Sequence, residues 1–321
     1  MRFDTPCLDA GLRDNVRGYN DPPSGSPQSL EYRRPEPEKY AAMPLRTAPV
    51  YIGADVGGTW IRVATARGGR FTTETIRTDR DLRRLASRLE PVWRRHGWSR
   101  RRVQVMVVAS RGLWTARERR ALAKSLRGLA RRVAVISDAQ AALLGALGNR
   151  PGVLVLSGTG SILVGYDGRG RWARAGGLGP LIGDEGSGFW LGREWLRATV
   201  QARNLSRTLR LVHAPDPVAA IAALAPSVLA RARRGDPIAR RIVRDGQRHL
   251  AANLQAVARR LALRGPIDAS WAGRVLGNRW FRAGVMRAMT RAGLRARWHQ
   301  PAEAPVVAAA RLAEILGRRG Q

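Results

Sequence analysis

The amino-acid sequence predicts an α/β protein that is long enough for two domains. Between residues 50 and 147, apolar runs of strand length alternate with segments of helical apolar spacing, a pattern typical of a mainly parallel sheet. Two glycine-rich hairpins, residues 57–59 and 158–160, lie about a hundred residues apart, each between apolar runs. A chain of 321 residues can also bury two separate cores.

Composition narrows the class of protein further. No uncharged apolar run reaches the roughly 18 residues that a membrane span needs, and the N-terminus has early acidic residues and no apolar core of a secretory signal. The single cysteine, Cys7, cannot form an internal disulfide and argues against a cysteine-ligated metal or iron–sulfur site. The four histidines are scattered, without metal-ligand spacing. We therefore expect a cytoplasmic protein.

The formal net charge of +33 comes from 57 Lys+Arg against 24 Asp+Glu, and only Lys39 and Lys124 are lysines. Such an arginine bias is typical of a GC-rich coding sequence, so part of the excess reflects drift on solvated faces. Nucleic-acid binding stays open as an alternative use of the charge. Neither lysine has the neighbours of a Walker A loop, which excludes a P-loop NTPase.

Residues 1–47 are proline-rich and polar, and we expect them to form a disordered tail. Order is predicted to begin at Val50, with two strands on either side of Gly57-Gly58-Thr59. Glycine would meet the positive φ of this hairpin, and its backbone N–H groups could approach a phosphate. Asp55 lies just before the turn, where a carboxylate could hold hydrated Mg²⁺.

Asp138 is a candidate site residue because it follows a predicted strand, and polar groups of a site gather at the carboxyl ends of parallel strands. An isolated aspartate before a helix is more often an N-cap, so that interpretation stays open. The elements expected here are a helix over 81–97, a strand over 103–109, a helix from the capping box Thr115–Glu118 to about 129, a strand over 133–136 and a helix over 139–147.

The stretch from Pro151 to Trp190 is the most distinctive part of the chain. Apolar runs at 153–156 and 162–166 flank Ser157-Gly158-Thr159-Gly160-Ser161, a second hairpin able to cradle an anion. A glycine-rich loop, 176–186, then carries Asp184 and Glu185. Beyond it we expect helices over 186–203, 216–233 and 236–263, a strand over 266–272 that leads into Gly273, a helix over 279–291, a strand over 294–298 and a helix over 304–317.

The two hairpins, with Asp138 between them, resemble the motifs of the actin-like ATPase and sugar kinase superfamily. More narrowly, SGTGS followed by GGLGPLIGDEGSGFWLG resembles the BadF/BadG/BcrA/BcrD ATPase family, which includes N-acetylglucosamine kinase. The likeness extends over about residues 50–316. It implies two actin-like (ribonuclease H-like) domains, residues 48–150 and 151–321, with ATP in the cleft between them and the last helix returning to the first domain.

The resemblance also implies roles for individual residues. Asp138 would be the catalytic base, and Asp55 would lie near Mg²⁺. ATP would be bound by Gly57, Gly58, Thr59, Gly158, Thr159, Gly160, Ala232 and Gly273. The sugar would be lined by Ser110, Asp138, Ser161, Gly177, Leu178, Gly179 and Asp184.

We therefore expect an ATP-dependent kinase of an amino sugar, N-acetylglucosamine or glucosamine, which could form a homodimer. Two alternatives remain. An activator ATPase of a CoA-ester dehydratase or reductase would need a cysteine-bound iron–sulfur cluster, and Cys7 lies in the predicted tail. A sensor or basic-surface nucleic-acid-binding protein on a kinase fold is the other, although Asp55, Asp138 and Asp184 are all retained.

Overall fold

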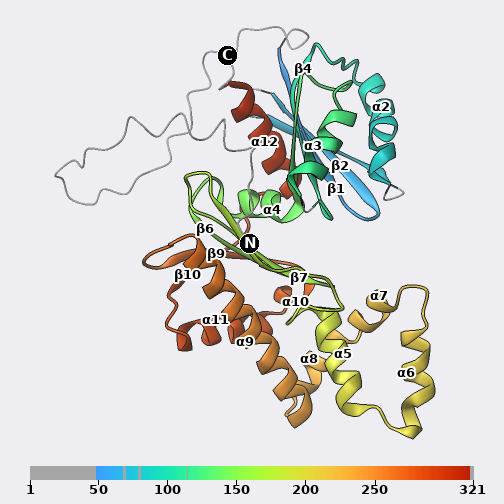
Figure 1. The fold of residues 1–321 in the computed structure, drawn as a ribbon, viewed down its shortest axis with the longest axis vertical. Coiled ribbons are helices and arrows are strands. Elements are labelled where there is room, and N and C mark those ends of the chain that lie inside the picture. Colours follow the sequence, from blue (N-terminus) through green and yellow to red (C-terminus); the bar gives the residue numbers. More distant parts are fainter. Residues whose placement is uncertain (1–47, 68–69, 79–80, 114, 319–321) are drawn as a thin grey trace, which may run out of the picture. The chain divides into compact units, whose positions relative to one another are not determined.

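The computed structural model describes residues 48–67, 70–78, 81–113 and 115–318, so the predicted tail lies outside the described residues. The chain divides into two compact units (Figure 1). Unit 1 runs up to Ala141 and resumes at Glu303, and unit 2 comprises Ala142–Ala302. The sequence placed this division at residue 150, whereas it falls inside helix α4, Asp138–Leu147.

Unit 1 is built on a five-stranded sheet in the order β3-β2-β1-β4-β5. The β1–β2 and β2–β3 pairs are antiparallel, and the β1–β4 and β4–β5 pairs are parallel. The expected mainly parallel sheet is therefore wrong, because a meander of consecutive strands supplies half of the pairs. The strands are β1 Val50–Val56, β2 Trp60–Arg67, β3 Arg70–Arg77, β4 Val103–Ser110 and β5 Arg132–Ser137.

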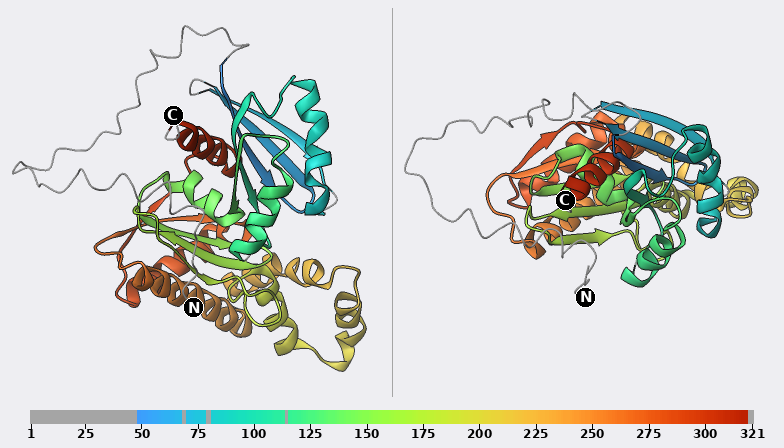
Figure 2. Two further views of the ribbon diagram at one scale, coloured as in Figure 1. Left: turned by 45° about the horizontal axis from the view of Figure 1, so that its top comes forward. Right: turned by 90° about the horizontal axis from the view of Figure 1, so that it is seen from above.

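Helices cover both faces of this sheet, with α12, Pro305–Arg318, on one face and α2, Leu85–Arg95, on the other (Figures 1 and 2). Gly53 in β1 allows α12 to approach closely, because a Cβ there would lie 2.8 Å from the Ala309 carbonyl carbon. Leu85, Leu89 and Val92 of α2 pack into the core of the opposite face. The other helices of this part are η2 Leu82–Arg84, α3 Ala116–Ser125, which has the predicted capping box, and the start of α4.

Unit 2 repeats the same arrangement of strands. Its sheet has the order β10-β9-β6-β7-β8, with antiparallel β6–β7 and β7–β8 pairs and parallel β6–β9 and β9–β10 pairs. A hairpin meander followed by two parallel strands thus occurs in both units. The strands are β6 Gly152–Ser157, β7 Ser161–Tyr166, β8 Trp172–Gly176, β9 Ile267–Ala272 and β10 Ala296–His299.

The long helix α9, Pro237–Arg260, packs against the unit 2 sheet and beside α11, Arg279–Arg291 (Figure 1). Its predicted start is confirmed, since the Asp236 carboxylate accepts a hydrogen bond from Ala239 N at 3.0 Å. The helix expected over 216–233 is divided into α7 Pro217–Ala222 and α8 Ala225–Arg233. The remaining helices are α5 Gly188–Thr199, η3 Ala202–Asn204, α6 Leu205–Val212 and α10 Arg274–Gly277.

Four of the described elements were not predicted from the sequence: β3, β8, α6 and α10. Among the described helices, none combines the length and apolar character that crossing a membrane requires.

Candidate active site

Three candidate residues of unit 1 gather at one edge of its sheet. In the strand register, Val56 pairs with Ser110 and Ser110 pairs with Ser137, so β1, β4 and β5 end at the same level. Asp55, Ser110 and Asp138 lie at these ends, as expected for a parallel strand set. The Ser110 side chain is buried, and its Oγ donates to the Arg111 carbonyl at 3.2 Å.

Asp138 is the first residue of α4 and is not its N-cap. Ser137 caps the helix: its Oγ accepts from Gln140 N at 3.1 Å, and Gln140 Oε1 accepts from Ser137 N at 2.9 Å. This Ser-x-x-Gln capping box could have been found in the sequence. Asp138 Oδ1 accepts from the adjacent Ala139 N at 2.8 Å. The N-cap interpretation is therefore wrong, and the helix does not depend on the Asp138 carboxylate for capping.

Burial raises the pKa of the Asp138 carboxyl, and the Ala139 N–H and the charge of Arg111 offset part of that rise. The pKa of Asp55 is raised as well, chiefly by burial; Arg62 lowers it and the charge of Asp138 raises it. Arg62 Nη1 donates to Asp55 Oδ2 at 3.3 Å from the facing position on β2. The Asp138 carboxylate is thus close enough for its charge to oppose ionisation of Asp55.

The first hairpin is tied to the strands around it. Gly57 N donates to the Trp60 carbonyl at 2.9 Å, and Thr78 N donates to the Thr59 carbonyl at 3.1 Å. The expected positive φ is wrong for Gly57, which is outside the left-handed region. Glycine at position 57 instead allows a close approach of the Trp60 carbonyl, since a Cβ would lie 3.1 Å from its oxygen.

The second hairpin, in unit 2, is anchored through its carbonyl groups. Gly188 N donates to the Gly158 carbonyl at 2.7 Å, and Phe189 N donates to the Thr159 carbonyl at 3.1 Å. Within the part of the chain that the structure describes, no acceptor is recorded for the N–H groups of Thr159 and Gly160. The start of α5 therefore holds the hairpin through the carbonyl oxygens of Gly158 and Thr159. The N–H groups of Thr159 and Gly160 are left available to an anion.

Gly273 lies directly behind this hairpin. Its φ is +91°, and a Cβ there would overlap the Ser157 carbonyl and lie 2.8 Å from Gly158 N. Only glycine satisfies both conditions. The structure thus brings together two motifs that are more than a hundred residues apart in the sequence.

Hydrogen bonds clamp the glycine-rich loop onto the same hairpin. The buried Asp184 carboxylate accepts from the backbone N–H groups of Ser161 and Gly179, and burial is the main reason why the pKa of this carboxyl is raised. Ser161 Oγ donates to the Glu185 carbonyl at 2.9 Å. Ser157 Oγ, which the sequence did not single out, donates to the Gly186 carbonyl at 2.8 Å. The polar atoms of Ser161 and Asp184 therefore hold the loop in place.

Glycine is required at three points of this assembly. A Cβ on Gly160 would lie 2.6 Å from Asp184 Oδ2. Gly177 and Gly179 have φ values of +67° and +87°, in the left-handed region. Between them, Leu178 leaves 58% of its surface exposed.

Ala232, the predicted neighbour of adenine, lies in the core of unit 2. It has 0% exposed surface, and its carbonyl accepts from Arg240 Nε at 3.1 Å. Its contact with adenine stays a prediction.

Comparisons with known proteins agree with these motifs. The family model of the BadF/BadG/BcrA/BcrD ATPase family matches residues 52–310. An N-acetylmuramic acid/N-acetylglucosamine kinase of Clostridium acetobutylicum is 31% identical over 169 residues, 46% of this chain and 55% of that protein. An N-acetyl-D-glucosamine kinase of Dictyostelium discoideum is 30% identical over 141 residues, 37% of this chain and 44% of that protein. The chain therefore spans about half the length of the curated relatives it matches.

Solved structures show the same fold. A protein of Chromobacterium violaceum, provisionally named an N-acetylglucosamine kinase, has a TM-score of 0.59 at 23% identity, over 83% of this chain and 99% of that chain. A ROK family glucokinase of Streptomyces griseus, solved with glucose and AMPPNP, has a TM-score of 0.51 at 21% identity, over 83% and 99% of the two chains. The two units are thus the actin-like domains of the sugar kinase fold. Because the family model covers most of the chain, with both hairpins, Asp138 and Gly273, this protein belongs to the BadF/BadG/BcrA/BcrD ATPase family.

Proposed function

We propose that the protein is an ATP-dependent kinase that phosphorylates a hydroxyl group of an amino sugar, N-acetylglucosamine or glucosamine. The names of the curated relatives support this class of substrate. The observation that carries the proposal is Asp138: a partly buried carboxylate at the carboxyl end of β5, beside Asp55, in a helix that Ser137 caps. A carboxylate that is dispensable for capping is free to act on a substrate.

Each unit has a hairpin whose backbone N–H groups could contact the phosphates of ATP. In unit 2, the N–H groups of Thr159 and Gly160 would donate to phosphate oxygens, with Gly273 holding the loop from behind. Gly158 leaves room for a phosphate to approach the hairpin backbone. Apart from the chain neighbours of Gly158, the nearest described atom to a Cβ at this position would be Gly273 Cα, at 3.8 Å. In unit 1, Gly57, Gly58 and Thr59 would provide the second set of phosphate contacts.

Mg²⁺ fits the chemistry of Asp55. Carboxylate oxygens are ligands that this ion prefers, and a cation would relieve the repulsion between Asp55 and Asp138. The described residues hold no cluster of three or more metal-ligating side chains, which suits an ion that takes most of its ligands from water and substrate phosphates. When bound, it would neutralise charge on the phosphates.

In the proposed reaction, Asp138 accepts the proton of the sugar hydroxyl while that oxygen attacks the γ-phosphorus of ATP. The bond from the γ-phosphorus to the bridging oxygen breaks, ADP leaves, and the phosphoryl group remains on the sugar. Burial supports this role, because a raised pKa makes the ionised carboxylate a stronger base at neutral pH. The backbone-bound Asp184 and Ser161 would shape the sugar side of the loop.

Sugar-dependent ADP release by Asp138→Asn tests the proposal. The panel would contain N-acetylglucosamine, glucosamine, N-acetylmannosamine and glucose. We expect turnover to fall by roughly 10²-fold or more, while AMPPNP affinity stays near that of the wild type. Ser137→Ala is the matched control: it removes the helix cap, costs about 0.5–2 kcal/mol of stability and should leave far more turnover. Wild-type turnover in folded Asp138→Asn would overturn the assignment of the base.

A further inference from the structure

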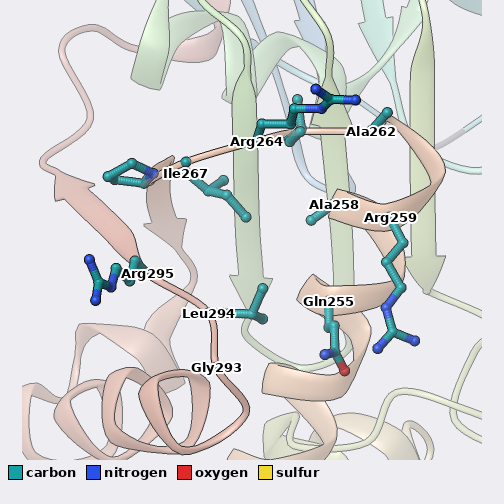
Figure 3. A pocket seen from close by; sticks show the side chains of 12 residues that line it. Gln255, Ala258, Arg259, Ala262, Arg264, Ile267, Gly293, Leu294 and Arg295 are labelled. Atoms are coloured by element: carbon teal, nitrogen blue, oxygen red, sulfur yellow. The ribbon is translucent and has the colours of Figure 1, made fainter.

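A hollow with a volume of about 410 Å³ lies in unit 2, where the end of α9 meets the starts of β9 and β10 (Figure 3). That volume lies within the range of small-molecule sites, which runs from about 300 to 1,000 Å³. The hollow is separate from the candidate active site. Ile267, which lines it, begins β9, and Gly273 follows the end of that strand, roughly 20 Å away at about 3.3 Å per residue.

The lining combines an apolar floor with a basic rim. Ile267, Leu294 and Ala258 face the centre of the hollow, and the first and last of these are almost fully buried (Figure 3). Three arginines stand around it on separate segments: Arg259 on α9, Arg264 in the following turn and Arg295 before β10. Among the described residues, no acceptor is recorded for any of the three guanidinium groups. They are therefore free to turn onto a ligand.

No carboxylate offsets this charge within the lining. The nearest acid along the chain, Asp268, follows Ile267 on the strand, so its side chain leaves the opposite face of the sheet. There it accepts from Arg297 Nε at 3.0 Å and is bonded to His299 Nε2 at 2.7 Å. A hollow of similar volume in unit 1, about 420 Å³, contains Glu90 beside its arginines. The unit 2 hollow differs in that the charged residues of its lining are all arginines.

From this lining we propose that the hollow binds a small organic anion, a carboxylate or phosphate joined to an apolar group. The apolar part would cover Ile267 and Leu294, and the charged group would lie at the rim within reach of Arg264 and Arg295. Guanidinium groups bind both anions through paired N–H donors, so the two share one recognition chemistry. This site goes beyond the proposed kinase function and does not depend on it.

Calorimetric titration of the full chain, without nucleotide, tests the site. The probes are phenyl phosphate, benzoate and uncharged benzyl alcohol, and the variant is Arg264→Gln/Arg295→Gln. Arg287→Gln is the matched control, because this exposed arginine of α11 lies outside the lining. We expect one of the two anions to bind the wild type, and the double variant to lose about tenfold or more in affinity. The control should bind like the wild type.

Each outcome decides the proposal. Tighter binding of phenyl phosphate or of benzoate identifies which anion the rim prefers, and either supports the site. The proposal is overturned if neither anion binds, if benzyl alcohol binds equally well, or if the double variant and Arg287→Gln behave alike. A short DNA duplex that competes with the probe and loses affinity in the double variant would also overturn it, since the hollow would then belong to a general polyanion surface.

Discussion

Replacing Gly273 with alanine tests the connection between the end of β9 and the second hairpin. At a φ of +91°, a residue with a side chain is strained by about 1–3 kcal/mol. The new Cβ would overlap the Ser157 carbonyl and lie 2.8 Å from Gly158 N, against 3.4 Å for ordinary contact. The hairpin would have to shift by more than about 0.6 Å, the difference between these two distances, because the overlap with the Ser157 carbonyl is closer still. Such a shift misdirects the N–H groups of Thr159 and Gly160.

The expected effect is on nucleotide binding first. A hydrogen bond to a charged group contributes about 1.5–3 kcal/mol, so losing one would raise the Kd for AMPPNP about 10- to 100-fold. The assay is calorimetric titration with AMPPNP and Mg²⁺, alongside thermal unfolding. Gly277→Ala is the matched control, because Gly277 ends the short helix α10, which Gly273 precedes as its N-cap, and a Cβ at Gly277 would meet no atom within 4 Å. Wild-type AMPPNP affinity in a folded Gly273→Ala protein would refute the reasoning.

Three further predictions concern the buried polar groups. Asp138→Asn should raise the melting temperature at pH 7.5 while it lowers turnover. Burial raises the pKa of the Asp138 carboxyl in the folded state, so the stability that this carboxyl contributes is present at low pH and is lost as the pH rises through the folded pKa. An uncharged asparagine does not carry this loss at pH 7.5. This gain in melting temperature should vanish below about pH 4, near the pKa of aspartate in the unfolded chain. A gain that persists below that pH would show that the ionised Asp138 carboxylate is not its cause. For the same reason, the acid limb of kcat/KM should lie above the pKa of an ordinary aspartate, and a limb at the ordinary value would exclude Asp138 as the titrating base. Ser157→Ala leaves the Gly186 carbonyl without its donor and should lower the free energy of unfolding in denaturant by about 1–3 kcal/mol. Ser206→Ala, at an exposed position of α6, should leave that free energy unchanged. Equal effects of the two substitutions would show that the clamp is dispensable for stability.

Most of the fold could be predicted because its central strands and long helices carry strong local patterns. Both hairpins join apolar runs, and Asp236-Pro237 marks the start of α9. The missed strands β3 and β8 are different. β3 reads RFTTETIR and lies at a sheet edge, so it has few apolar residues and forms because β2 offers an antiparallel partner. Tertiary pairing, rather than local preference, creates such strands.

The site divides in the same way. Asp55 and the hairpins could be located because each motif is contiguous in the sequence. The clamp formed by Ser157, Ser161 and Asp184 could not, since the bonds between the hairpin and the loop join residues more than twenty positions apart and depend on how the loop folds back. The burial of Ala232 could not be foreseen, because a motif comparison carries no information about burial.

The return of α12 to unit 1 has a consequence for synthesis on the ribosome. The contacts of Gly53 with α12, and of Tyr51 with Gly317, join β1 to α12, so this face of the unit 1 sheet stays uncovered until α12 has emerged from the ribosome. Unit 2 is continuous in sequence, and all of its residues leave the ribosome earlier. Unit 2 can therefore complete its fold before unit 1, although the strands β1 to β5 of unit 1 are translated earlier. Premature termination before Pro305 would leave the apolar face of β1 uncovered and mark the unfinished product for chaperones and proteases.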